Sequence, residues 1–280
     1  MESFNTEPQQ PERALSLVDS TSIIVGIIIG STIYESSPDI ATGCARFADE
    51  WSRRLGWSEY AETLEVATIL SVWIVGGIIA LVGAMCYAEL ATAYPRAGGT
   101  YVYLSEAFGR DVGFAFAWTE FWIVRPGNVG AIAFVMASYA GEIIWPLGGA
   151  TQWQKAILAS GAVLLLGIIN ALGLRAGTRT QNWLTAAKLI GLAAIVITAF
   201  TIPRSTQPQP IVADAWENIM LSLILVMFAY GGWADMSFVA AEIKHPEKNI
   251  SRGLLTGTLA VLVIYLAANA AFLWVFGVGG

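Results

Sequence analysis

Two of the long apolar stretches in this chain are interrupted by glycine. The first interruption runs from Gly26 to Thr32, and the second runs from Phe228 to Trp233, with the sequence Phe-Ala-Tyr-Gly-Gly-Trp. Inside a lipid bilayer every backbone polar group needs a partner, so irregular backbone is tolerated there only where it is buried in protein or lines a cavity. The pattern therefore predicts two broken helices that line a solvated cavity, as at the substrate site of a secondary transporter.

Composition places the chain in a membrane. Of the 280 residues, 56% are hydrophobic and 13% are charged, whereas soluble domains carry about 25% charged residues. The 11 tryptophans and 28 glycines fit the same class, because Trp marks membrane interfaces and Gly is common in spanning helices. The net charge of −6 indicates no nucleic-acid partner. With one histidine and two cysteines, we expect neither a metal nor a cofactor.

The sequence contains seven apolar segments long enough to cross about 30 Å of hydrocarbon, which takes roughly 20 helical residues. The third segment is longer than one crossing, so we expect it to be tilted or to extend past the bilayer. The predicted fold is an all-α membrane protein. Its spans are expected near residues 15–37, 64–93, 112–146, 155–173, 181–202, 215–241 and 253–278.

The basic residues predict the orientation of these spans. If the N-terminus is cytoplasmic, eight Lys and Arg residues fall on the inner side and five on the outer side, which fits the inner excess of membrane proteins. The inner residues are Arg13, Arg96, Arg110, Arg175, Arg179, Lys244, Lys248 and Arg252, and the outer residues are Arg46, Arg53, Arg54, Lys155 and Arg204. We therefore expect a cytoplasmic N-terminus; the membrane itself is expected to be the plasma (inner) membrane.

Residues 40–62 form a polar insert between the first two spans. Phe47, Trp51 and Leu55 recur there at intervals of four residues, which predicts an amphipathic surface helix outside the membrane. The pattern does not distinguish between two alternatives, namely a solvated helix without a further role and a helix that acts as a gate or lid. Cys44 is interpreted as a loop residue of this insert and Cys86 as a helical residue, so no disulfide between them is expected.

The order of the spans predicts an internal repeat. The proline-rich segment from Thr201 to Pro210 separates five spans from two more, and the sixth span repeats the glycine-broken character of the first. This order is typical of an inverted repeat of five plus five helices. The predicted parts are a cytoplasmic tail at 1–14, a first repeat at 15–202 and the start of a second repeat at 211–280. We expect a truncated fold that lacks at least three helices.

Four motifs, in this order, resemble those of one family of membrane proteins. They are Gly83 to Leu90 with Ala93 to Tyr103, then Trp118 to Phe121 with Arg125 to Gly127, then Phe228 to Trp233, and Glu242 to Ile250. The chain resembles the amino acid–polyamine–organocation (APC) superfamily, in its branch of L-type amino acid transporters and bacterial amino acid permeases. The resemblance covers the chain from about residue 15 to the end and implies a transporter rather than an enzyme.

The resemblance implies a site for a zwitterionic amino acid at the two breaks. The substrate carboxylate is expected on the amides and hydroxyl around Gly30, Ser31 and Thr32, and the ammonium on the carbonyls of Ile28, Phe228 and Gly231. Such partners are needed because an unpaired charge in a low-dielectric site is costly. Thr32 stands where the family usually has glycine, which restricts the backbone there.

Other residues in the spans leave alternatives open. Gly26 and Gly30 could instead form a packing seam of small residues, and Phe228 and Trp233 could either close over the substrate or pack. Asp235 could select a cationic side chain, pair with Arg125 or line a water-filled vestibule. Glu120 and Arg125 match the family pattern, and a structural or gating role is expected for them.

Lys188 lies within the fifth span, and an ionisable residue at such a position is a functional candidate by default. In sodium-independent members of the family a lysine at the matching place stands where sodium-coupled relatives bind a cation. The resemblance therefore implies that the Lys188 ammonium binds unwound carbonyls of the first span near Gly26, and that transport needs no sodium. The alternative is a lysine that snorkels to an interface.

The sequence thus predicts an amino acid permease that works by alternating access, through exchange or proton symport. Animal relatives attach to a partner subunit through a cysteine in the loop between the third and fourth spans. The corresponding segment from Pro146 to Gln154 has no cysteine, so no disulfide-linked ancillary subunit is expected. The competing hypothesis is a sensor or assembly subunit that keeps the pocket and does not transport.

Overall fold

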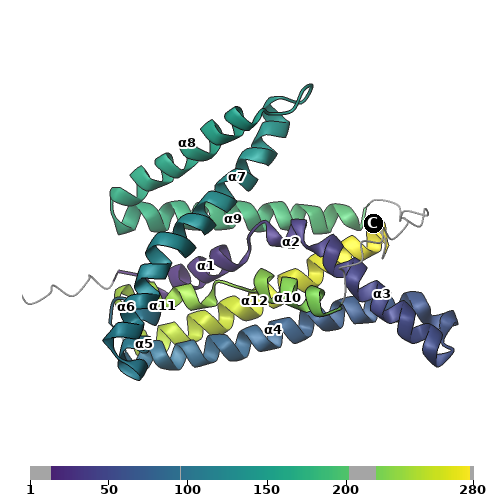
Figure 1. Ribbon diagram of the computed structural model, residues 1–280, viewed down its shortest axis with the longest axis horizontal. Coiled ribbons are helices and arrows are strands. Elements are labelled where there is room, and N and C mark those ends of the chain that lie inside the picture. Colours follow the sequence, from purple (N-terminus) through teal and green to yellow (C-terminus); the bar gives the residue numbers. More distant parts are fainter. Residues whose placement is uncertain (1–13, 95, 202–218, 278–280) are drawn as a thin grey trace, which may run out of the picture. The chain divides into compact units, whose positions relative to one another are not determined.

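The computed structural model describes residues 14–94, 96–201 and 219–277, and over these residues the chain is helical (Figure 1). Within these ranges no strand forms, and one isolated parallel bridge joins Leu15 to Ile243. The predicted tail at 1–14, apart from its last residue, lies outside the described residues, as do the loop from residue 202 onward and the first residues of the sixth predicted span.

Seven helical segments in the described ranges are long and apolar enough to cross a membrane, so the predicted set of spans is confirmed. Their bounds differ from the predicted ones by six residues or fewer at most ends. The segments are Leu17–Glu35, Ser58–Ala93, Arg110–Ile144, Gln152–Ala171, Arg175–Ala199, Ile219–Glu242 and Pro246–Phe276. Segments of this length and hydropathy are typical of an integral membrane protein of the all-α class.

The chain divides into two compact units, residues 1–99 with 182–280 and residues 100–181. The first unit holds α1 (Leu17–Ile28), α2 (Thr32–Glu35), α3 (Ser37–Leu55), α4 (Ala61–Ala93), α10 (Ile219–Ala229), α11 (Met236–Val239) and α12 (Pro246–Phe276). The second holds α5 (Thr100–Phe108), α6 (Arg110–Thr119), α7 (Arg125–Ile144) and α8 (Gln152–Ala171), and α9 (Leu174–Ala199) is shared. These two units do not coincide with the two repeats predicted from the sequence, at 15–202 and 211–280. The division into repeats stays a prediction.

Three fully buried aromatic rings form the centre of the first unit. Trp73 of α4, Tyr230 after α10 and Tyr265 of α12 are in mutual contact, with ring centroids 5.2 to 5.9 Å apart in edge or tilted arrangements. Such arrangements add to the stabilisation that comes from burying the rings. The three residues come from segments far apart in the sequence, so this cluster joins the second, sixth and seventh spans.

Small residues allow α1 and α12 to approach closely. A Cβ atom added at Gly257 of α12 would lie 2.8 Å from Cγ2 of Ile24, and one added at Gly253 would lie 3.2 Å from Cβ of Ser20. Because lipid offers no hydrophobic drive for helix association, close packing through small residues contributes much of the stability of such pairs. The first span is thereby held against the seventh.

The second unit contains an antiparallel pair of spans and a π-helical turn. α7 and α8 meet through Ala133, Ala137 and Ala159. The π segment Glu120–Val124 directly precedes α7, whose second residue is Pro126. Proline has no N–H for the helical ladder, so a local change of hydrogen-bond register at this point has a physical cause.

The insert between the first two spans is helical as predicted, but it is part of the packed first unit. α3 contacts α4 and α10, and the Ser222 hydroxyl donates a hydrogen bond to the carbonyl of Ile40 over 3.2 Å. Cys44 is fully buried within this helix, so its assignment to a loop was wrong. A cysteine is small enough to fit where α3 packs against its neighbours. The position of Cys44 in a segment rich in charged residues did not reveal this packing.

Cys44 should resist alkylation in the folded protein. Burial raises the pKa of its thiol to about 11, so about 0.1% of it is thiolate at pH 8, and the thiolate is the reactive form. We expect N-ethylmaleimide at pH 8 to leave Cys44 unmodified in the native state and to modify it fully after denaturation, as measured by peptide mass spectrometry. Native modification as fast as that of an unfolded cysteine would contradict the packing of α3.

Candidate functional site

The first span is broken, as the sequence predicts. α1 ends at Ile28, Ile29 is extended with φ −73° and ψ 93°, and α2 begins at Thr32. Figure 1 shows the non-helical stretch between α1 and α2. The backbone N–H groups of Gly30, Ser31 and Thr32 have no recorded partner among the described residues. Three adjacent backbone donors therefore lie at a half-buried turn within the span, where a carboxylate could accept their hydrogen bonds.

The sixth span is broken as well. α10 ends at Ala229, and the turn from Tyr230 to Gly232 leads into a short 3₁₀ segment, Trp233–Asp235. Gly232 has φ 106° and ψ −15°, a conformation that L residues with a Cβ atom rarely adopt. The glycine pair thus marks a real change of chain direction inside the bilayer segment.

The two breaks touch each other within the first unit. A Cβ atom added at Gly232 would lie 2.5 Å from Cγ2 of Ile27. The hydroxyl of Tyr265 on α12 lies 2.9 Å from the carbonyl oxygen of Ile28 and 3.1 Å from that of Ala229. Because a hydroxyl carries one proton, it donates to one carbonyl at a time, and it can exchange between the last turns of α1 and α10.

Tyr265 was not among the residues singled out from the sequence. Its signal was a tyrosine in the middle of an apolar span, because a buried phenol usually finds a hydrogen-bond partner. The identity of that partner depends on where α12 lies, which a single sequence does not reveal.

Lys188 reaches the first break from α9. Its Nζ donates hydrogen bonds to the carbonyl oxygens of Gly26 at 3.0 Å and Ile29 at 3.1 Å. Thr185 and Asn182, on the same side of α9, bind Ser22 and Asp19 of α1 at 3.4 Å and 3.0 Å. α9 therefore lies along α1 through four hydrogen bonds from three of its side chains, and the cation sits on carbonyls that the break leaves without helical partners.

The predicted residues of the sixth span behave differently from one another. The Phe228 carbonyl accepts a hydrogen bond from the N–H of Gly231 over 3.0 Å, and its ring is 72% exposed. The Trp233 ring lies in edge contact with Tyr87, with centroids 5.2 Å apart, and next to Gly83 of α4. Packing is thus the better supported of the two interpretations of Trp233.

The charged candidates lie in different units. Arg125 Nε donates to Oε2 of Glu120 over 2.8 Å, across the π-helical turn of the second unit. Asp235 ends the 3₁₀ turn of the first unit, and its N–H donates to the carbonyl of Gly232. The ion pair of Glu120 and Arg125 is compatible with a structural role, and the three interpretations of Asp235 stay predictions.

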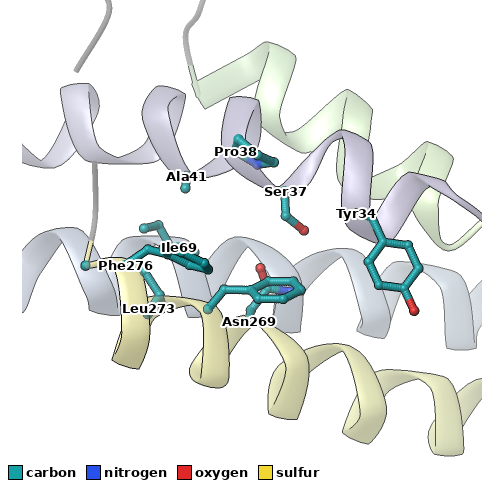
Figure 2. Close-up of a pocket in the computed structure, with 10 residues that line it drawn as sticks. Tyr34, Ser37, Pro38, Ala41, Ile69, Asn269, Leu273 and Phe276 are labelled. Atoms are coloured by element: carbon teal, nitrogen blue, oxygen red, sulfur yellow. The ribbon is translucent and has the colours of Figure 1, made fainter. Parts of the chain in front are cut away.

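A cavity of about 280 Å³ in the first unit is lined by residues of α2, α3, α4 and α12 and by Gly277. Figure 2 shows Tyr34, Ser37 and Pro38 on one wall, with Ile69, Asn269 and Phe276 among the residues on the others. Asn269 Nδ2 donates to the carbonyl of Tyr265, one helical turn before it. The lining is mostly apolar and contains none of the residues predicted to bind substrate.

Replacing Gly232 with alanine should disrupt the second break. The added methyl group would meet Ile27 and would also require φ 106° of an L residue, a combination that costs about 1–3 kcal/mol or more. We expect a lower melting temperature in detergent, measured by fluorescence-detected size exclusion. Gly191→Ala is the matched control, because no atom lies within 4 Å of a Cβ atom at that position. Equal melting temperatures for both variants would contradict the geometry.

Comparison with known proteins gives the family. A family model described as amino acid permease matches residues 15–279. The human large neutral amino acids transporter small subunit 2 is 31% identical over 270 residues, which cover 93% of this chain and 47% of that protein. The human b(0,+)-type amino acid transporter 1 is 27% identical over 268 residues, which cover 93% of this chain and 51% of that protein.

The fold and the two breaks define a membrane protein of the permease class. The chain belongs to the amino acid permease family of the APC superfamily, a family of transporters and not of enzymes, which confirms the resemblance stated from the motifs. The chain spans about half the length of the curated relatives it matches.

Proposed function

We propose that this chain forms the amino-acid-binding part of a secondary transporter that works by alternating access. The observation that carries the proposal is the hydroxyl of Tyr265, which lies within hydrogen-bond distance of the last turns of both broken helices. A site shared by two broken spans can change shape when either span moves. The relatives' names, which refer to amino acid transport, support the same conclusion.

The chemistry of the breaks fits a zwitterionic substrate. The N–H groups and the Ser31 hydroxyl of the first break suit a carboxylate, because charge-assisted hydrogen bonds to an ionised acceptor are about twice as strong as neutral ones. The carbonyls of Ile28 and Gly231 suit an ammonium, and the Ile28 carbonyl has a second lone pair beside the one that faces the Tyr265 hydroxyl. The Phe228 carbonyl already accepts from Gly231, and its second lone pair remains for the substrate.

The contacts of Lys188 support sodium-independent transport. Its ammonium lies on the carbonyls of Gly26 and Ile29, which are the type of hard oxygen ligand that a metal cation would need. A fixed cation at this place stabilises the unwound backbone without an ion from solution. We propose exchange or proton symport of neutral amino acids, in a plasma membrane and with the N-terminus in the cytoplasm.

The partner is proposed to be the amino acid substrate within a lipid bilayer. The loop between α7 and α8, residues 145–151, contains no cysteine, so we propose that no ancillary subunit is attached through a disulfide at this loop. Non-reducing electrophoresis of the protein from its native membrane tests this directly. A reducible high-mass band that disappears in the Cys44→Ser, Cys86→Ser double variant would contradict the proposal.

Uptake into proteoliposomes tests the proposed function. A panel of labelled L-amino acids should include neutral and cationic members, each assayed with and without internal amino acid and with sodium or choline outside. We expect neutral amino acids to be taken up. Internal amino acid should stimulate this uptake, and replacing external sodium with choline should leave its rate unchanged. Substrate binding by scintillation proximity, without uptake, would support the alternative of a sensor or assembly subunit. Absence of both binding and uptake would refute the site itself.

A further inference from the structure

α3 has an apolar side that its protein neighbours cover only in part. The small or short residues on that side are buried, as Ile40, Cys44, Ala48 and Ser52 show. The large residues Phe47, Trp51 and Leu55 run beside them and stay 37% to 51% exposed. These three residues form the apolar stripe of α3. An amphipathic pattern would normally place such a stripe against the protein core, but here it lies beside the buried residues and is partly exposed.

The exposed apolar surface continues through the turn that follows α3. Trp57 is 53% exposed and Tyr60 is 60% exposed, and both immediately precede α4. The rings of Phe47 and Trp51 lie 6.0 Å apart, and the guanidinium of Arg54 lies 5.6 Å from the Trp51 ring. Tryptophan and tyrosine, with an apolar body and a polar tip, are the residues enriched where a bilayer meets water.

The opposite side of α3 is charged. Arg53 pairs with Asp49, and Arg54, near the edge of the stripe, pairs with Glu50; the side chains of Arg53, Arg54 and Glu50 are more than half exposed. A helix with an aromatic side and an ion-paired side is typical of helices that lie in a membrane interface.

The sequence of α4 sets the depth of this surface. Its apolar stretch, residues 66–88, is flanked by Glu65 and Glu89 and rises about 34 Å as a helix, close to the thickness of the hydrocarbon core. Tyr60 is five residues beyond Glu65, which corresponds to about 8 Å. This distance places Tyr60 and Trp57 among the lipid headgroups, since headgroups extend the bilayer by about that much on each side.

The stripe is continuous with surface that must face lipid or other spans. α4 exposes a run of aliphatic side chains on its outer side, namely Ile74, Val75, Ile78, Ile79 and Val82. α3 and α4 pack against each other as a helical hairpin (Figure 1). Going back along α3 from the turn, Leu55, Trp51 and Phe47 therefore lie at increasing depth towards that aliphatic band.

We propose that the surface made by Phe47, Trp51, Leu55, Trp57 and Tyr60 lies in the lipid interface and holds the α3–α4 hairpin at the boundary of the bilayer. The occupant is the region of phospholipid between headgroup and acyl chain. Lipid removes the aromatic side from water, which favours this position by about 25 cal/mol for each Å² of apolar surface covered. The inference does not depend on whether the chain transports amino acids.

Spin labels along α3 test the proposal. Single cysteines at 47, 51 and 55, in a Cys86→Ser background that keeps the buried Cys44, are labelled with a nitroxide in the full chain reconstituted in phosphatidylcholine nanodiscs. Collision with oxygen reports contact with lipid, and collision with a soluble nickel chelate reports contact with water. We expect the ratio of oxygen to nickel accessibility to be severalfold higher at the three stripe positions than at matched labels replacing Glu50 and Arg53.

The depth order makes the test specific. The ratio should fall from position 47 to 51 to 55, and a label at Ile78 should give a higher ratio than any of them. Equal accessibility at stripe and charged positions would overturn the proposal by placing the stripe in water. Low accessibility to both reagents would overturn it by showing that protein covers the stripe, either other helices of the molecule or a partner.

A label-free measurement guards against perturbation by the nitroxide. Lipids brominated near the headgroup end of their acyl chains quench tryptophan that lies at that depth. The Trp51→Phe variant should lose a component of the emission that these lipids quench in the unaltered protein. If the component lost in this variant were instead quenched by aqueous acrylamide and insensitive to bromine, Trp51 would not be in the lipid interface.

Discussion

Replacing Lys188 with alanine should reduce amino acid uptake by more than about tenfold while leaving the protein expressed and membrane-inserted. The substitution removes two charge-assisted hydrogen bonds to the carbonyls of Gly26 and Ile29, each of which is worth about 1.5–3 kcal/mol. A loss of 1.4 kcal/mol in the transport-competent state is a factor of about ten in rate. Initial uptake rates in proteoliposomes, normalised to reconstituted protein, measure the effect.

The same assay separates this mechanism from general loss of charge. Lys248→Ala is the matched control, because Lys248 is an exposed residue near the start of α12, away from both breaks. Its uptake should equal that of the unaltered protein. Uptake by the Lys188→Ala variant at the unaltered rate would remove Lys188 from the mechanism and favour the interpretation of a snorkelling lysine. If uptake by the Lys188→Ala variant came to require sodium, this result would support the proposal that the Lys188 ammonium takes the place of a bound cation.

Replacing Tyr265 with phenylalanine should reduce uptake by about tenfold at an unchanged fold. The ring remains in the cluster with Trp73 and Tyr230, while the carbonyls of Ile28 and Ala229 lose their shared donor. A buried acceptor left without a partner costs about 1–3 kcal/mol, and this cost falls on the two segments that the proposed mechanism moves together. Uptake rate and melting temperature, measured on the same preparation, separate a functional effect from a loss of stability.

Tyr230→Phe is the matched control for Tyr265. The Tyr230 hydroxyl is buried and has no hydrogen-bond partner among the described residues, so its removal should leave uptake unchanged and could stabilise the protein slightly. The two variants delete the same atom type from neighbouring rings of one cluster. If both reduced uptake equally, the cluster would act by packing alone, and the hydrogen bonds of Tyr265 would have no special role.

The helix breaks were predictable because they depend on local chemistry. Gly231 and Gly232 interrupt an apolar span, and glycine permits the backbone conformation observed at Gly232. The contact of Lys188 with the first break was inferred from the family resemblance, and the structure places Nζ on the carbonyls of Gly26 and Ile29. Its role in transport stays a prediction.

Other features needed the positions of neighbouring helices. The amphipathic pattern of Phe47, Trp51 and Leu55 predicted a helix but not the position of its apolar side. Cys44 was expected in a loop because the segment around it is rich in charged residues, whereas it is fully buried in α3, which packs against α4 and α10. Burial depends on what packs against a residue, and a single sequence records only the residue.

The sequence by itself determined that this chain is helical, that its described residues hold seven apolar segments long enough to cross a membrane, and that the first and sixth of these are broken. Backbone polar groups in lipid must be paired within the segment, so length, hydropathy and glycine are sufficient evidence for such features. Only the tertiary structure decided that Tyr265 joins the two breaks and that Trp233 packs on α4. These are contacts between residues far apart in the chain, and they exist only once the helices have packed.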